Sequence, residues 1–271
     1  MHISFIGLGH LNSAIVAGLL ADGFDRTKIT ATTFSAASAE TRSAEFGIEV
    51  IATQDNPQAN CDAVADADIV VLGVKPMHIV ETATGLAAAL KPEATVVSVA
   101  AGVTVATLTA ALPAGQPVVR TMPNVALTVG QGVVGMARGA NVSDEQVAQV
   151  QSIFAESGTV FPVPEEQLNA LAAVAGSGPG YVFRFVNALA AAGTHLGLDA
   201  TDAHELARLT VVGAATMLEL PDADPTALEN SIATQGGTTE AALQSFDANG
   251  FNQLMIDALR ANVARSEELG A

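Results

Sequence analysis

The chain has 271 residues, more than one domain usually holds, and 49% hydrophobic against 14% charged residues indicate a globular protein rather than a disordered one. Its formal net charge of −17 at pH 7 argues against nucleic acid and anionic membrane surfaces as partners. A single cysteine, Cys61, excludes an internal disulfide and suits a reducing compartment, so we expect a cytoplasmic protein.

The first predicted elements are a short strand, a glycine turn and a helix. Residues 2–6 are mostly apolar and lead into Gly7-Leu8-Gly9, and a helical pattern follows from about His10 to Ala21. This stretch has no basic leader and is interrupted by glycines, so we do not expect a signal sequence. Elsewhere the chain has no uninterrupted apolar run of about 18 residues, so we expect no membrane span.

Further strand candidates alternate with Ala- and Leu-rich stretches of helical spacing, such as 77–90 and 104–112. The predicted strands are residues 28–34, 48–51, 68–74, 95–100 and 117–122. Such alternation predicts a mostly parallel sheet with helices on both faces, whose ligands bind beyond the carboxyl ends of the strands.

The glycine turn lies at that ligand position. Gly7 would allow a tight turn, Gly9 would let the backbone approach a pyrophosphate, and the following helix would supply N–H groups. The third glycine of the usual dinucleotide fingerprint falls at Asn12, so the motif is incomplete. A tight turn without a ligand stays open as the alternative.

The end of the second predicted strand bears on which dinucleotide would bind. Residues 32–35 read Thr-Thr-Phe-Ser, and no acid follows before Glu40. An acid here would bind the ribose 2′-OH of NAD and repel a 2′-phosphate, whereas small hydroxyls can donate to a phosphate. The segment therefore favours NADP, with NAD kept as the alternative because no arginine lies directly beside the hydroxyls.

The pattern changes near residue 157. Residues 143–157 begin with a capping-box pair, Ser143 and Gln146, and stop before Gly158. After one more strand candidate at 159–163, the remaining patterns are helical: about 165–175, 179–197, 201–220, 225–233 and 237–268, with an interruption near 249–250. We predict a dinucleotide-binding domain over 1–157 and a helical domain over 158–271.

One helix of the second domain is apolar around most of its circumference. Residues 205–220 read ELARLTVVGAATMLEL. In a domain of this size, such a helix suggests burial against a second subunit. The alternative is that it forms the centre of its own domain.

A second glycine-rich turn opens a helix near the end of the chain, in GGTTEAAL (236–243). The first N–H groups of a helix are unpaired and would form a seat for a carboxylate, with the hydroxyls of Thr238 and Thr239 beside it. A capped helix start that binds nothing is the alternative. AGSGPGY (175–181) introduces another helix in the same way.

Six motifs in one order resemble the pyrroline-5-carboxylate reductases and span nearly the whole chain. They are FIGLGHL (5–11), Asn60 followed by GVKP (73–76), VSVAAG (97–102), RTMPN (120–124), GSGPGYVF (176–183) and GGTTEAAL (236–243). The resemblance implies an α/β Rossmann-type N-terminal domain followed by an all-α dimerisation domain, with homodimers that often assemble further. It also implies reduction of a small cyclic imine carboxylate, above all 1-pyrroline-5-carboxylate to L-proline, by NADPH or alternatively NADH.

The resemblance also implies the site residues. It places Ile6, Gly7, Leu8, Gly9, His10 and Leu11 at the pyrophosphate, Thr33 and Ser35 at the adenosine ribose, Asn60, Gly73, Val74, Lys75 and Pro76 along the rest of the dinucleotide, and Ala101 near the nicotinamide. Gly236, Gly237 and Thr238 would bind the substrate carboxylate, and the catalytic Thr239 hydroxyl would hydrogen-bond the ring nitrogen. No metal is implied.

The chemistry needs no histidine or lysine as a strong acid. A cyclic imine can be protonated near neutral pH before it binds, so orienting it toward a hydride donor can provide much of the rate. We therefore interpret His195 and His204 as structural or surface residues, and Lys75 as support for the cofactor loop.

Departures from the family pattern cluster in the motifs expected near the substrate. The family usually has Thr-Pro where this chain has Val125-Ala126 after Asn124, and Ser-Pro where it has Thr234-Gln235. A lost hydroxyl changes which substrate a site accepts. A reductase of a different cyclic imine and a non-catalytic dinucleotide-binding dimer therefore stay open. A hydroxyacid dehydrogenase is disfavoured, because it would place a catalytic lysine in the second domain and no lysine follows Lys91.

Overall fold

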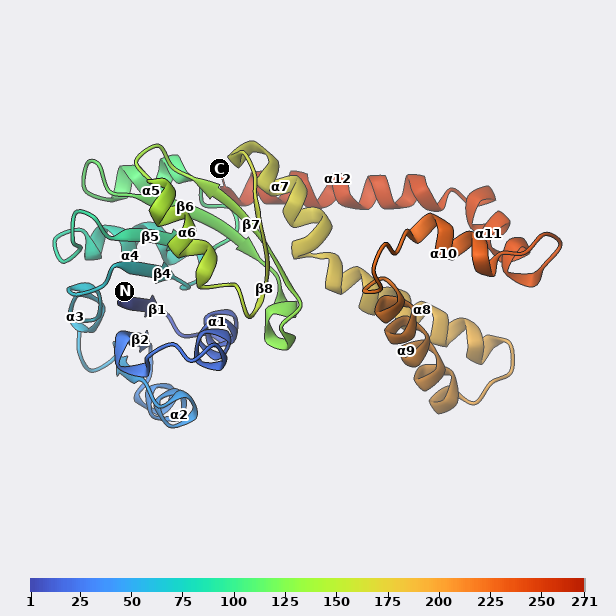
Figure 1. Cartoon of the computed structure of the whole chain (residues 1–271), viewed down its shortest axis with the longest axis horizontal. Helices are drawn as coiled ribbons and strands as arrows, with labels where there is room; N and C mark the ends of the chain where they lie inside the picture. The colour runs from blue at the N-terminus through green and yellow to red at the C-terminus, as the bar shows by residue number, and fades with distance from the viewer. Residues whose placement is uncertain (271) are drawn as a thin grey trace. The chain divides into compact units, whose positions relative to one another are not determined.

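The structure, a computed structural model, describes residues 1–270. The chain divides into two compact units, which we describe separately (Figure 1). The first consists of Met1–Ser177 together with the chain from Asn262 onward, and the second is Gly178–Ala261. The sequence-based domain boundary at residues 157 and 158 stays a prediction.

An eight-stranded sheet forms the first unit, in the order β3-β2-β1-β4-β5-β6-β7-β8. Its strands are β1 (Ile3–Ile6), β2 (Ile29–Thr33), β3 (Glu49–Ala52), β4 (Ile69–Leu72), β5 (Thr95–Ser98), β6 (Val118–Pro123), β7 (Gly132–Arg138) and β8 (Gly158–Pro162). All neighbours from β3 to β6 are parallel, β7 is antiparallel to β6, and β8 is parallel to β7. This confirms the predicted mostly parallel sheet.

Two hydrophobic cores cover the two faces of this sheet. Alternate residues of β4 point into different cores, because successive side chains of a strand face opposite ways. Ile69 and Val71 pack in the core that includes α1 (His10–Ala21) and the segment of α6 (Asp144–Ser152). Val70 and Leu72 pack in the core with α3 (Ala59–Val64), α4 (Ile79–Leu86) and α5 (Val105–Ala111). The predicted helices on both faces are therefore confirmed, and α2 (Ala36–Phe46) adds Phe46 to the first core.

Strand β1 marks the point where the order of the sheet reverses. It pairs with β2 on one side and with β4 on the other, and its last residue, Ile6, is in register with Thr32 and Leu72. The carboxyl ends of the three strands therefore meet at one edge. In open α/β sheets the crevice at such a reversal is where ligands bind.

Strand β7 is the element of the sheet that the sequence pattern did not reveal. Gly132 and Gly135 interrupt its apolar run, and glycines weaken a strand signal. Both are needed for close packing: a Cβ on Gly132 would lie 2.2 Å from a Leu127 side-chain atom, and one on Gly135 would lie 2.7 Å from a Leu171 side-chain atom. The chain returns into β7 through the short helix η3 (Val125–Val129).

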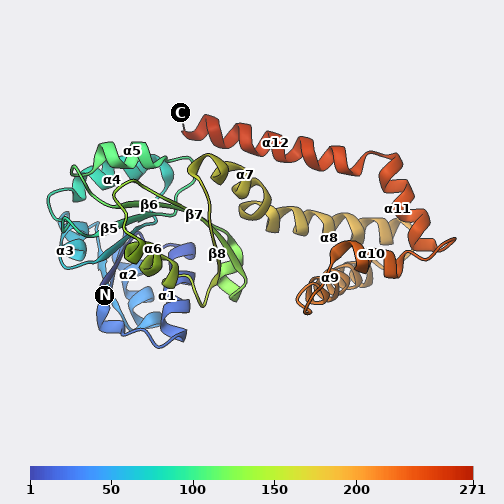
Figure 2. The same ribbon diagram turned by 45° about the horizontal axis from the view of Figure 1, so that its top comes forward.

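The remaining helices confirm the predicted helical second half. They are α7 (Leu168–Leu171), α8 (Gly178–His195), α9 (Ala200–Met217), α10 (Pro225–Ile232), α11 (Thr238–Ala248) and α12 (Phe251–Gly270). Helices α8 and α9 lie side by side in both views (Figure 2). Between α7 and α8 one turn widens to a π-helix over Ala172–Gly176.

Large apolar side chains remain exposed on the second unit. On α9, Leu206, Leu209 and Val212 are each at least half exposed, and Ala203 and Ala207 are the buried residues of that helix. The unit therefore presents apolar side chains at its surface.

Candidate active site

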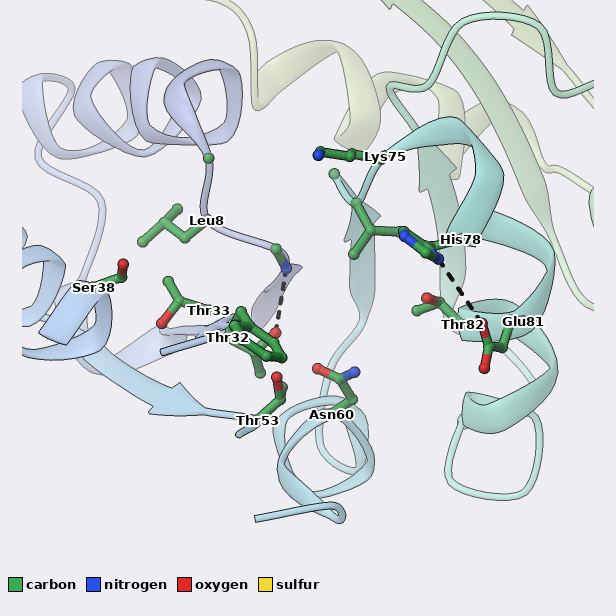
Figure 3. Close-up of a pocket in the computed structure, with 15 residues that line it drawn as sticks. Leu8, Thr32, Thr33, Ser38, Thr53, Asn60, Lys75, His78, Glu81 and Thr82 are labelled. Carbon is green, nitrogen blue, oxygen red and sulfur yellow. Dashed lines mark hydrogen bonds and ion pairs between the residues drawn. The ribbon is translucent and has the colours of Figure 1, made fainter. Parts of the chain in front are cut away.

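A cavity of 780 Å³ opens at the carboxyl ends of β1, β2 and β4 (Figure 3). It brings together eight of the residues predicted to bind the cofactor: Gly7, Leu8, Gly9, Thr33, Asn60, Gly73, Val74 and Lys75. It is also lined by Thr32 and Phe34, from the segment 32–35 that bears on the choice of dinucleotide, and by five residues that the sequence pattern did not indicate: Ser38, Thr53, His78, Glu81 and Thr82. Their common signal is position, since each lies on or just after a strand end or in the helix that follows.

The turn between β1 and α1 is shaped by its two glycines. Gly7 has a φ of +87°, a conformation that side chains rarely adopt, and its N–H donates to the Thr32 hydroxyl at 3.2 Å. Gly9 is the N-cap of α1, and a Cβ built on it would meet no atom within 4 Å. The backbone is therefore open to close approach at Gly9 and fixed at Gly7.

The amino terminus of α1 suits an anion. Its N-cap makes no side-chain hydrogen bond, and its first turn carries no acidic residue. The first N–H groups of a helix point outward without intrahelical partners and carry a partial positive charge. His10 and Leu11 belong to this turn, although neither lines the cavity, and Ile6 lies fully buried at the end of β1.

Asn12, at the place of the third fingerprint glycine, has a structural partner. Its side chain is 1% exposed, and its Nδ2 donates to the Gly7 carbonyl at 2.9 Å. A Cβ on Gly73 would lie 2.0 Å from the same Nδ2. The Asn12 amide thus fills the space between the two cofactor loops, and Gly73 is glycine because that space is taken.

The charged side chains of the cavity come from the loop after β4 and from α4. Lys75 precedes the short helix η2 (Pro76–His78), in which Pro76 takes the first position. His78 Nδ1 lies 3.9 Å from Glu81 Oε2. In Figure 3 these residues lie across the cavity from Thr33 and Ser38, which belong to the side formed by β2 and α2.

The predicted hydroxyls at the end of β2 are largely engaged within the chain. Thr33 Oγ1 donates to the Ser35 carbonyl at 3.3 Å. Ser35 is the N-cap of α2, where its Oγ accepts from the Ser38 N–H at 3.3 Å. Of the three residues, Thr33 and Ser38 line the cavity and Ser35 does not.

Asn124 and Val125 lie at the end of β6. Asn124 is 6% exposed, and its Oδ1 accepts from the N–H groups of Ala126 and Val133. Its Nδ2 donates to the Ala175 carbonyl at 3.0 Å, which ties β6 to the π-helix. Val125 opens η3 and is 54% exposed. Ala101, also exposed, follows β5 and does not line the cavity.

The glycine–threonine turn of the second unit opens α11 as predicted. Gly236 has a φ of +74°, and Gly237 is an N-cap without a side-chain hydrogen bond. The Gly236 N–H donates to Glu240 Oε2 at 2.7 Å, and the Gly237 N–H donates to the Thr234 carbonyl at 2.8 Å. Thr238 and Thr239 follow as the first residues of the helix, whose N–H groups have no intrahelical acceptor.

Within residues 1–270, no three His, Cys, Asp or Glu side chains gather in a way that could hold a metal ion. Over the same range, no helix has both the length and the apolar character needed to cross a membrane.

A sheet that reverses its strand order at β1, with a glycine turn and an uncapped helix start at a large cavity, defines a dinucleotide-binding protein of the Rossmann class. Two family models match the chain: residues 2–102 match "NADP oxidoreductase coenzyme F420-dependent", and residues 165–269 match "Pyrroline-5-carboxylate reductase dimerisation".

Similarity to known proteins identifies the family within this Rossmann class. The pyrroline-5-carboxylate reductase of Pseudomonas aeruginosa is 40% identical over 268 residues, which are 98% of this chain and 96% of that protein. A solved pyrroline-5-carboxylate reductase from Coxiella burnetii is 34% identical, with a TM-score of 0.91 over 100% of this chain and 98% of that one. Plasmodium falciparum pyrroline carboxylate reductase with NADP bound, 24% identical, shares the fold at a TM-score of 0.85, covering 100% of this chain and 98% of that one. The chain belongs to the pyrroline-5-carboxylate reductase family.

Proposed function

We propose that the chain reduces 1-pyrroline-5-carboxylate to L-proline with NADPH as the hydride donor, NADH being the alternative. The observation that carries the proposal is the cavity at the carboxyl ends of β1, β2 and β4, which gathers eight residues of the family's cofactor motifs in one place. Membership of the family, with the relative from Pseudomonas aeruginosa covering 98% of the chain, supplies the reaction.

The residues present fit a dinucleotide. The open approach at Gly9, the uncapped start of α1 and the absence of an acid in its first turn suit a pyrophosphate. Lys75 adds a positive charge on the other side of the cavity. When bound, the reduced nicotinamide supplies a hydride from its C4 to the imine carbon.

The preference for NADPH rests on the end of β2. The residues that line the cavity include Thr33 and Ser38 there, and its one acidic side chain, Glu81, comes from α4 instead. A carboxylate at the end of β2 would repel a 2′-phosphate, and hydroxyls would not. Dissociation constants for NADP⁺ and NAD⁺ test this preference directly.

The chain's own groups bind and orient the substrate. The N–H groups of Thr238 and Thr239 hold the carboxylate, and the glycines before them give the turn its shape. The Thr239 hydroxyl hydrogen-bonds the ring nitrogen, which enters already protonated and keeps its proton as the C=N bond becomes a C–N bond. Within the first unit, Asn124 fixes the start of η3 and so the position of Val125, and within the second unit the Thr234 carbonyl accepts from the Gly237 N–H.

The same proposal includes a homodimer in the cytoplasm. Pairing of two chains through the exposed apolar residues of α9 would remove them from water. The family model that covers the second unit is named for dimerisation. Assemblies of several dimers are an extension of this proposal, and sedimentation of the full chain distinguishes them. We also propose that the dinucleotide-binding domain spans residues 1–157 and the helical domain spans residues 158–271.

The test is oxidation of NADPH and NADH by the purified chain with a panel of five- and six-membered cyclic imines. We expect turnover of 1-pyrroline-5-carboxylate to exceed that of the other rings. Thr239→Val should lower kcat about tenfold or more, since it removes one hydrogen bond to the reacting ring, and Thr239→Ser should retain most activity. Preference for another ring would support the substrate shift suggested by Val125, and dinucleotide binding without any turnover would contradict the proposal.

A further inference from the structure

Phe34 is an exposed aromatic residue in the cavity. It follows β2 directly, lines the cavity, and is 76% exposed. Single exposed apolar side chains on a surface need no explanation. A large exposed ring inside the cavity of a dinucleotide-binding fold is different, because a ligand that enters the cavity would cover it.

The backbone that carries this ring is fixed. The Thr53 N–H donates to the Thr33 carbonyl at 2.8 Å, and the Gln54 N–H donates to the Phe34 carbonyl at 2.9 Å. These bonds continue the pairing of β2 with β3 past the ends of both strands. The ring therefore projects from an anchored position and has only two side-chain torsions to lose on binding, which favours a contact surface.

The position of Phe34 indicates that it would contact the adenosine half of a bound dinucleotide. In this fold the pyrophosphate lies at the turn after the first strand, and the adenosine ribose lies at the end of the second strand. Gly7 and Gly9 form that turn here, and the Thr32 hydroxyl bonded to Gly7 belongs to β2. The adenine base attached to the ribose thus reaches the residues just beyond β2.

Of the described residues that line the cavity, those on the side formed by β2 and α2 include no charged side chain that could contact the adenine base. Thr33, Ser38 and Thr53 are neutral, and the charged residues of the cavity, Lys75, His78 and Glu81, come from the opposite side (Figure 3). The hydroxyl of Thr33 and the N–H of Ser38 are already bonded within the chain. Among the residues at the end of β2, Phe34 offers the base a planar apolar contact.

We propose that Phe34 stacks on the adenine ring and provides the main contact to that base. The proposal rests on the proposed function only in that it requires a dinucleotide in this cavity. Because adenine is common to both cofactors, the contact contributes equally to NADPH and NADH. Removing an aromatic ring from a base stack typically weakens binding about tenfold to a hundredfold.

Calorimetric titration of the full chain with NADP⁺, NAD⁺ and adenosine 2′,5′-bisphosphate tests the contact. We expect Phe34→Ala to raise all three dissociation constants by a similar factor of about ten or more, and Phe34→Tyr to restore them. Phe161→Ala is the matched control: Phe161 is also an exposed ring, 48% exposed, but it lies on β8, at the opposite edge of the sheet from β2 and β3. It should leave the three constants unchanged.

A second readout reports stacking itself. The chain has no tryptophan, so Phe34→Trp introduces a single one. Its fluorescence should be quenched by adenosine 2′,5′-bisphosphate, a ligand without nicotinamide, and the melting temperature of the ligand-free variants should match that of the wild type.

The outcomes separate the two proposals. Unchanged dissociation constants in Phe34→Ala, or a tryptophan that stays bright while adenosine 2′,5′-bisphosphate binds, would overturn the stacking contact and leave imine reduction intact. An effect on NADP⁺ with none on adenosine 2′,5′-bisphosphate would place Phe34 elsewhere along the ligand and overturn it as well. A wild-type chain that binds neither dinucleotide would remove the proposed function itself.

Discussion

Gly73 and Asn12 form a coupled pair, and Gly73→Ala is the perturbation that exposes the coupling. A Cβ at Gly73 would lie 2.0 Å from Asn12 Nδ2, 2.7 Å from Asn12 Cγ and 2.9 Å from the Gly7 carbonyl oxygen. The φ of Gly73 is not in the left-handed region, so the cost of the substitution is steric alone. The new methyl group would push the Asn12 side chain away and break its hydrogen bond to Gly7.

The magnitudes follow from those contacts. Overpacking a core typically costs about 1–3 kcal/mol, and a lost buried hydrogen bond costs about 1 kcal/mol more, so Gly73→Ala should destabilise by about 2–4 kcal/mol. Asn12→Ala loses the same hydrogen bond and should cost about 1 kcal/mol. In the double variant the bond is lost once and only the contact with the Gly7 carbonyl remains, so its cost should fall below the sum by about 1–2 kcal/mol.

Urea denaturation of the four proteins of this cycle measures the coupling. Gly85→Ala is the matched control, because Gly85 lies in α4 with no atom within 4 Å of the Cβ position, and alanine there should stabilise by about 0.5–1 kcal/mol. Additive effects within about 0.5 kcal/mol would refute the pairing. So would a Gly73→Ala variant as stable as the wild type.

Three further variants test other parts of the first unit. Glu165 Oε1 accepts from Arg120 Nη1 at 3.1 Å and from the Val105 N–H at 2.8 Å, and the Arg120 side chain is 4% exposed. Glu165→Ala leaves that guanidinium buried without its carboxylate and should cost about 3 kcal/mol in urea denaturation, whereas a loss below about 1 kcal/mol would show the pair to be unimportant. Burial raises the pKa of Asp68, but hydrogen bonds from the His2 N–H and Lys91 and the positive charge of Lys91 outweigh it, so the pKa lies below its ordinary value of 3.8. The Asp68 carboxylate therefore stabilises the fold above that value and loses this effect as the pH falls through the lowered pKa. Denaturation from about pH 7 to about pH 3 should show a shallower acid loss for Asp68→Asn than for the wild type, and identical slopes would contradict this. Lys75→Ala should weaken NADP⁺ binding and reduce its dependence on salt, while Lys28→Ala, at a residue that does not line the cavity, should do neither in the same titrations.

The parts of the fold that follow from local pattern could be predicted from sequence. Strand β4, an unbroken apolar run, forms where the pattern placed it, and α6 begins at its Ser143–Gln146 capping box but ends at Ser152, before the predicted stop at Gly158. Strand β7 could not be predicted in this way, because Gly132 and Gly135 are explained only by the side chains of Leu127 and Leu171, which other segments bring against them.

In the candidate site, too, local motifs could be predicted from sequence, and contacts between distant segments could not. The turn at Gly7 and Gly9 is a local motif, and the cavity forms around it. The role of Asn12 needs Gly73, which lies far along the chain, and single-sequence patterns carry no such pairing. Bonds that engage a predicted donor are also invisible in a pattern: the Gly236 N–H, predicted for the substrate, donates to Glu240 instead.

The proposed function asks a chain of net charge −17 to bind a dinucleotide and a carboxylate, both anions. Side-chain charge offers only Lys75 and His78 among the residues of the cavity, with Glu81 beside them. Backbone N–H groups at helix starts provide a partial positive charge without adding a cation, and they are effective where no acid competes. Helix α1 meets that condition, since its first turn has no acid, whereas α6 begins with Asp144 and Glu145. At α11 the acid of the first turn, Glu240, reaches back to the Gly236 N–H. That contact does not occupy the N–H groups of Thr238 and Thr239, to which the proposed function assigns the substrate carboxylate, so the acidity of the surface and the binding of anions do not conflict.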